Sequence, residues 1–168
     1  MKTHSKVITP KLVAFIRHRF QLDWQGIHGA PHWARVRRNG LLLSKRSGAN
    51  CKIVELFAFL HDAERQNDGD DPEHGHRAAN LAIELSGDLI SVNSSELKIL
   101  TKACRGHSEG QTKSDITVMT CWDADRLDLG RVGIRPLADR LCTEAAKEPE
   151  IIEECYRQSL GTNSQCSQ

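Results

Sequence analysis

The sequence predicts an all-α fold, a single compact helical bundle. Along most of the chain, apolar residues recur every three or four positions between residues that typically start and stop helices. No segment shows a convincing alternation of apolar and polar residues, which is the pattern of a half-buried strand. The β-branched segment 115–122 leaves a strand as the alternative at that point only.

The first helix shows the boundary signals clearly. Thr9 is a candidate N-cap, Pro10 stands at the first helical position, and Leu12, Ile16 and Phe20 repeat every four residues. Proline, glycine, serine and asparagine separate the segments that follow. The expected helices cover residues 9–21, 31–47, 51–62, 71–87, 94–106, 114–130, 135–148 and 149–160.

The length of 168 residues suits one domain, which we expect over residues 1–160. A polar tail at 161–168 is expected to be flexible. The net charge of +1 gives no indication of a nucleic-acid or membrane partner. The sequence shows neither a secretory signal nor an apolar run long enough to span a bilayer, so a cytoplasmic location is expected. A homo-oligomer is compatible with these features.

The six cysteines are placed as buried thiols rather than as metal ligands. No pair has the C-x-x-C spacing of a structural zinc site or a thioredoxin-like motif. Several occupy apolar positions of the expected helices, where free cysteine packs as a small hydrophobic residue.

Five of the expected helices carry a histidine or a carboxylate on their apolar face. One such histidine is more often a satisfied core residue than a ligand. Five buried polar groups without partners, however, would each cost on the order of 1–3 kcal/mol, and one shared metal site in the core of the bundle would satisfy them together. The five residues are His32, His61, His74, His107 and Asp123.

The order of these residues resembles the HD-domain superfamily of metal-dependent phosphohydrolases. The resemblance rests on His32 in "HWARV", the His61-Asp62 doublet in "FLHD" and Asp123 in "WDADRLDLG", and it covers roughly residues 28–135. It implies that His32, His61, Asp62 and Asp123 bind one divalent ion, which would be Mn, Ni, Co, Zn, Fe or Mg. Asp125 is the rival of Asp123 and ranks lower, because it lies on roughly the opposite helical face.

Binuclear members of the superfamily have two further histidines, and His74 and His107 resemble them. His76 is the alternative to His74, and contact with phosphate is the alternative role for the pair. Only 12 residues separate Asp62 from His74, which is short for that subgroup. One ion is therefore the expected number, and two ions are the alternative.

The resemblance implies hydrolysis of a phosphate ester of a nucleotide or another small phosphorylated metabolite. Asp62 would take the catalytic role by helping to orient the attacking water. Some related nucleotidases carry a glutamate three residues after the doublet, where this chain has Arg65. The alternatives are a binuclear iron oxygenase and a non-catalytic nucleotide-binding module. The cationic residues expected to bind the phosphate are Arg65, Arg105, Lys45 and Arg126.

Overall fold

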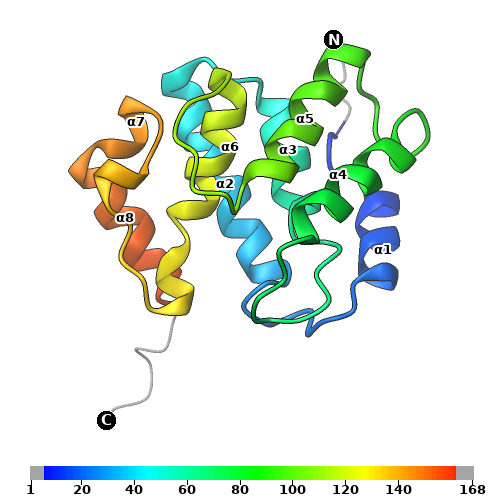
Figure 1. The fold of residues 1–168 in the computed structure, drawn as a ribbon, viewed down its shortest axis with the longest axis horizontal. Helices are drawn as coiled ribbons and strands as arrows, with labels where there is room; N and C mark the ends of the chain where they lie inside the picture. The colour runs from blue at the N-terminus through cyan, green and yellow to red at the C-terminus, as the bar shows by residue number, and fades with distance from the viewer. Residues whose placement is uncertain (1–5, 162–168) are drawn as a thin grey trace.

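Four helices, α2, α3, α5 and α6, pack against one another at the centre of the molecule (Figure 1). Helix α4 lies along α5, and α7 and α8 pack on the other side of the bundle against α2. The structure, a computed structural model, describes residues 6–161. Its helices are α1 (Pro10–Arg19), α2 (Ala30–Ser47), α3 (Cys51–Leu60), α4 (His74–Leu85), α5 (Ser94–Gly106), α6 (Ile116–Arg126), α7 (Glu144–Lys147) and α8 (Pro149–Ser159), with short 3-10 helices η1 (Leu129–Val132) and η2 (Ala138–Arg140).

The predicted all-α fold is confirmed, since no β-strand forms within residues 6–161. The segment 115–122, where a strand was the alternative, lies almost entirely within α6. The tail predicted at 161–168 lies outside the described residues except for Gly161. None of the helices between residues 6 and 161 combines the length and apolar character that a bilayer crossing requires.

Local signals explain where the helices begin. The Thr9 hydroxyl accepts a hydrogen bond of 3.1 Å from the backbone N–H of Leu12, which confirms the predicted N-cap of α1. Asn50 caps α3, Asp115 caps α6, and Asn93 caps α5 through a capping box with a glutamate. These caps fix the helix ends, and the candidate site is built from helix ends.

Two apolar clusters hold the bundle together. The larger cluster fills the space between the central helices and includes the fully buried Trp33, Phe57 and Leu100. The smaller cluster lies between α2, the end of α6 and the C-terminal helices, and includes Leu43 and Leu127. Helix α6 therefore has buried contacts on two sides rather than one.

The prediction of one helix over 135–148 is wrong. The chain forms η2 and the single-turn helix α7 there, joined by extended backbone. Gly133, at a φ of 79°, ends η1 in the left-handed region that favours glycine. The backbone N–H groups of Cys142 and Thr143 then donate to the Asp123 side chain. These two N–H groups therefore do not form the backbone hydrogen bonds of a helix.

Candidate metal centre

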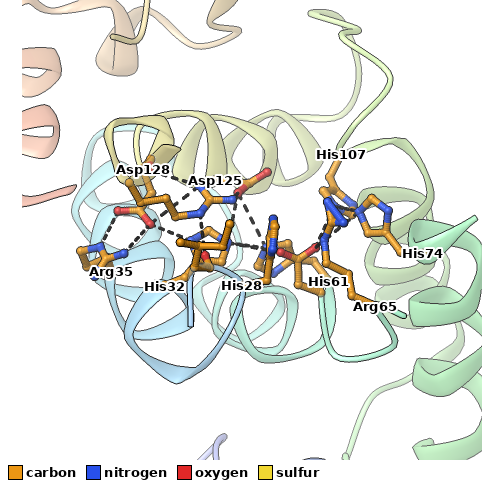
Figure 2. A network of polar contacts seen from close by, with 12 residues as sticks. His28, His32, Arg35, His61, Arg65, His74, His107, Asp125 and Asp128 are labelled. Carbon is orange, nitrogen blue, oxygen red and sulfur yellow. Dashed lines mark hydrogen bonds and ion pairs between the residues drawn. The ribbon is translucent and has the colours of Figure 1, made fainter. Parts of the chain in front are cut away.

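Four histidines and two aspartates meet where the ends of five helices converge (Figure 2). They come from the first turn of α2, the turn after α3, the start of α4, the residue after α5 and the last turn of α6. All are buried except one aspartate, whose side chain is only 14% exposed. The six residues are His32, His61, Asp62, His74, His107 and Asp125.

Each histidine is held by the ring nitrogen that faces away from the cluster. A neutral imidazole that donates through Nδ1 presents an unprotonated Nε2, which is the form that binds metal ions. The Nδ1 acceptors are the Asp128 carboxylate for His32 and the backbone carbonyls of Phe57 for His61, Asp71 for His74 and Cys104 for His107.

The four Nε2 atoms face one another in two pairs. The Nε2 atoms of His32 and His61 are 3.0 Å apart, and those of His74 and His107 are 2.8 Å apart. Two unprotonated nitrogens at such distances repel each other, so each pair requires a proton or a cation beside it. Metal ions satisfy two imidazoles at once, and N–N separations near 3 Å suit neighbouring ligands of one ion.

Asp62 lies between the two pairs and offers one oxygen to each. Its Oδ2 is 3.6 Å from the Nε2 of His32 and 3.7 Å from that of His61. Its Oδ1 is 3.4 Å from the Nε2 of His74 and 3.5 Å from that of His107. A carboxylate in this position can bridge two cations.

The electrostatics favour an ionised Asp62 beside positive charge. Burial raises the pKa of Asp62, but His61 and His107 outweigh burial and hold it well below its usual range. Burial lowers the pKa of His61 to about 3, which keeps this ring neutral. Burial also lowers the pKa of His107, but the hydrogen bond and charge of Asp62, together with Asp125 and the Cys104 carbonyl, outweigh burial and raise this pKa. A positive charge between Asp62 and His107 is therefore favoured.

Asp125 completes the group beside the first histidine pair. Its Oδ1 is 3.4 Å from the Nε2 of His32 and 3.7 Å from that of His61. This oxygen is buried and forms no hydrogen bond. A buried carboxylate oxygen without a donor is unfavourable unless a cation is close by, and the Arg131 guanidinium, at 3.8 Å, is too far to donate a hydrogen bond to it. The residues thus fit a metal ion. At each histidine pair, an ion would find at least three ligands, two imidazole nitrogens and one carboxylate oxygen.

Asp123, which the sequence predicted as a ligand, is not part of the cluster in this structure. Its two oxygens accept hydrogen bonds from the backbone N–H of Cys142 at 2.7 Å and from the N–H and hydroxyl of Thr143, both at 2.8 Å. Burial raises the pKa of this carboxyl, and the bonds from Thr143 and Cys142 oppose the rise. Asp123 faces the C-terminal segment, whereas Asp125 faces His32 and His61.

His74 rather than His76 belongs to the site. The His76 side chain is 52% exposed and lies near Glu73 on the surface of the protein. Gly75, between the two histidines, faces α5 at a point where an added Cβ would lie 2.6 Å from the Cys104 carbonyl oxygen and 2.9 Å from that of Arg105. This close approach of α4 to α5 brings the His74 and His107 rings together.

We expect Gly75→Ala to separate these two helices. Backbone carbonyls cannot yield as a side chain can, so overpacking should cost about 1–3 kcal/mol and lower Tm by about 2–12 °C. It should also weaken metal binding at the His74–His107 pair. The control is Asn80→Ala on an exposed position of α4, which should not lower Tm. Thermal unfolding and metal titration test both effects, and a Tm equal to that of the control would contradict the expectation.

Asp128 positions the His32 ring from behind. It accepts 2.6 Å hydrogen bonds from His32 Nδ1 and from Arg35 Nε, and it is fully buried. Such partners fix the tautomer of a ligand and raise its basicity. The sequence reasoning missed Asp128, although it lies in the same "DADRLD" motif as Asp123.

We expect Asp128→Asn to weaken metal binding at the His32–His61 pair about 10–100-fold. The amide can present its nitrogen to His32 and lacks the charge that holds Arg35. Calorimetric titration of the chelator-treated protein measures this change. The exposed Asp88→Asn is the control, and equal affinities of the two variants would contradict the role of Asp128.

A pocket of about 360 Å³ leads to the cluster from solvent. Asp62, Asp125, His74 and His107 form part of its wall. The wall also includes Arg65, Arg126, Arg131 and His28, together with Ser108, Gly110, Leu129 and Val132. The sequence reasoning missed Arg131 and His28. For His28 the only available signal was its place four residues before His32.

The predicted phosphate-binding residues do not all reach this pocket. Arg65 lines it and donates to Asp62 Oδ1 at 3.2 Å. Arg126 also lines it, but donates to the carbonyls of Gln111 and Arg140. Arg105 is exposed and lines a separate surface pocket with Lys98 and Lys102.

Lys45 is also placed away from the site. It is exposed and lies 13 residues after His32 on α2, which is about 20 Å along the helix axis. Neither Lys45 nor Arg105 is therefore placed to bind a phosphate held at the cluster.

Comparison with known proteins gives one informative likeness. No family model matches the chain, and no curated protein matches it. Among solved structures, the fold is similar to the crystal structure of a predicted HD superfamily hydrolase from an uncultured Thermotogales bacterium. The TM-score is 0.67 at 25% sequence identity, and the match covers 89% of this chain and 86% of the other. This likeness, joined to the ordered histidine and aspartate motif, supports the HD-domain superfamily as the family of this chain.

Proposed function

We propose that this protein is a phosphohydrolase that uses two divalent metal ions to cleave a phosphate ester of a nucleotide or another small metabolite. The observation that carries the proposal is the position of Asp62, with one oxygen toward each histidine pair. The likeness to a predicted HD superfamily hydrolase supports the reaction class.

The ligand sets differ in composition. The first ion would be held by His32, His61, Asp125 and Asp62 Oδ2, and the second by Asp62 Oδ1, His74 and His107. This assignment replaces Asp123 with Asp125. It also favours two ions over the single ion expected from the sequence, because the second histidine pair is as closely spaced as the first.

The ions would polarise a phosphoryl oxygen and lower the pKa of water toward neutrality. Around them, Arg65 and Arg131 supply positive charge on the pocket wall. Arg131 is fixed by its donation to the Ile27 carbonyl at 2.9 Å, and Arg65 by its bonds to the 67–69 loop. Guanidinium groups fit phosphoryl oxygens through paired hydrogen bonds, so these two residues would orient the substrate.

The pocket volume supports a small substrate. About 360 Å³ lies at the lower end of the range of ligand-binding cavities, so a monophosphate suits the pocket better than an extended chain. The test is phosphate release from a panel of nucleotides and phosphorylated metabolites, using protein loaded with Mn, Co, Ni, Zn, Fe or Mg. Turnover of at least one ester supports the proposal. Failure of every metal-loaded form would overturn it, and tight nucleotide binding without turnover would indicate a binding module.

An iron oxygenase is the second candidate, and the complete His74–His107 pair is the observation that favours it. Imidazole and carboxylate ligands suit iron as well as the other metals named above. Metal analysis of protein purified without an affinity tag, followed by measurement of oxygen uptake, distinguishes the two. Iron at two per chain with oxygen uptake and without phosphate release would favour the oxygenase.

A further inference from the structure

His28 and Asp68 form a hydrogen-bonded pair on the pocket wall, outside the ligand sets. The Nδ1 of His28 is 2.9 Å from Asp68 Oδ1. The histidine is 6% exposed, whereas the Asp68 side chain is 54% exposed and belongs to the loop after α3. Figure 2 shows His28 beside the ligand histidines, in the segment that leads into α2.

The carboxylate sets the orientation and the tautomer of the His28 ring. With Nδ1–H donating to Asp68, the ring's Nε2 is left to exchange a proton with a molecule in the pocket. Burial lowers the pKa of His28, and the hydrogen bond to Asp68 opposes this change. The pair therefore keeps the ring closer to its ordinary titration range than burial alone would.

The Asp68 loop is itself braced. Arg65 donates to the carbonyls of Asn67 and Gly69, and the N–H of Gly69 donates to the Asn67 side chain at 2.8 Å. Because Arg65 also contacts Asp62, the loop that carries Asp68 is tied to the metal cluster. The His28–Asp68 pair is thus held at a defined place on the wall of the pocket, next to the cluster.

The other polar groups of the pocket wall are unsuited to proton donation. Arg65, Arg126 and Arg131 do not release a proton in the physiological range. The aspartates and the other histidines of the wall belong to the proposed ligand sets. In the part of the wall that the structure describes, His28 is the one histidine outside the ligand sets, and imidazole is the side chain whose ordinary titration range lies nearest neutral pH.

We propose that His28 donates the proton to the leaving-group oxygen of the phosphate ester and that Asp68 is its positioning residue. This inference rests on the proposed function and adds the proton donor to it. The bond between phosphorus and the leaving oxygen breaks as water's oxygen bonds to phosphorus. The leaving oxygen takes the proton from His28 Nε2 and departs as an alcohol. The proton that water loses restores His28 through solvent, so the products are the alcohol and hydrogen phosphate.

A proton donor is needed only when the leaving group is poor, and this gives a test. We compare kcat for p-nitrophenyl phosphate, whose leaving group needs no proton, with kcat for a simple alkyl phosphate. His28→Asn should lower kcat for the alkyl ester about 10²-fold or more and leave the nitrophenyl ester within about threefold. Asp68→Asn should show the same dependence on leaving group with a smaller loss. His18→Asn, at an exposed histidine of α1, is the matched control.

The outcomes separate this inference from the proposed function. Equal losses on the two esters, or no loss on either, would overturn the role of His28 while wild-type turnover still supports the phosphohydrolase. Absence of wild-type turnover would overturn both. Metal content and Tm are measured for each variant. If His28→Asn does not fold, the test uses Asp68→Asn, whose position is more exposed. Equal losses of kcat on the two esters in that variant would overturn the role of the His28–Asp68 pair.

Discussion

Replacing Asp62 with asparagine should lower the bound metal by at least one ion per chain and lower kcat by at least about 10³-fold. A bound ion contributes several kcal/mol to stabilising the charge of the transition state, and about 1.4 kcal/mol corresponds to each factor of ten. Within residues 6–161, Asp62 is the one residue that contacts all four histidine Nε2 atoms, at 3.4–3.7 Å. A single substitution therefore reaches both sites.

The asparagine variant keeps the shape of the side chain but loses its charge. One of its two positions becomes an amide nitrogen, which cannot bind a cation, so at least one histidine pair loses its carboxylate ligand. Metal content by elemental analysis and phosphate release are the measurements. Asp70→Asn, at an exposed position a few residues later, is the matched control. Two ions per chain in Asp62→Asn, with kcat equal to that of the control, would contradict the bridging role.

Helix periodicity was sufficient to find four of the six residues in the cluster. His32, His61, His74 and His107 were expected on apolar helix faces, and all four are buried. The reason is physical, since a histidine on the buried face of a bundle points toward the other buried faces. The adjacent Asp62 followed from the resemblance to the HD-domain superfamily.

Periodicity could not choose between the two aspartates of α6. It correctly placed Asp123 on a buried face, and this residue is 0% exposed. Helix α6, however, packs on two sides, and the second side meets a segment whose predicted helix does not form. One face of α6 packs on the C-terminal segment and another faces His32. The sequence does not distinguish these two faces, because it does not show how the C-terminal segment packs.

Residues outside regular helices were beyond the reach of the same reasoning. His28 precedes α2, Asp68 lies in the loop after α3, and Arg131 lies in η1. Each is placed by hydrogen bonds between segments far apart in the sequence, such as the 40 positions between His28 and Asp68. Spacing along one helix carries no information about such contacts.

The two aspartates of α6 should differ when each is replaced by asparagine. One variant should lose stability, and the other should lose metal and activity. Asp123→Asn should lower the free energy of unfolding by about 3 kcal/mol and Tm by about 6–12 °C, because its amide nitrogen would face donors from Cys142 and Thr143. Its metal content should not change. Asp125→Asn should lose the first ion and lower kcat about 10²-fold or more, because that ion would lose a ligand.

The two variants act as controls for each other, since each changes one carboxylate to an amide in the same helix. Tm is measured in chelator, because a bound ion stabilises the folded state and would mix the two effects. In chelator, Asp125→Asn should lose less stability than Asp123→Asn, since its Oδ1 accepts no hydrogen bond and its ion pair with Arg131 is long, at 3.8 Å. Loss of metal in Asp123→Asn with wild-type stability would return the ligand role to Asp123. The expected result instead assigns Asp123 to holding the C-terminal helices and Asp125 to the reaction.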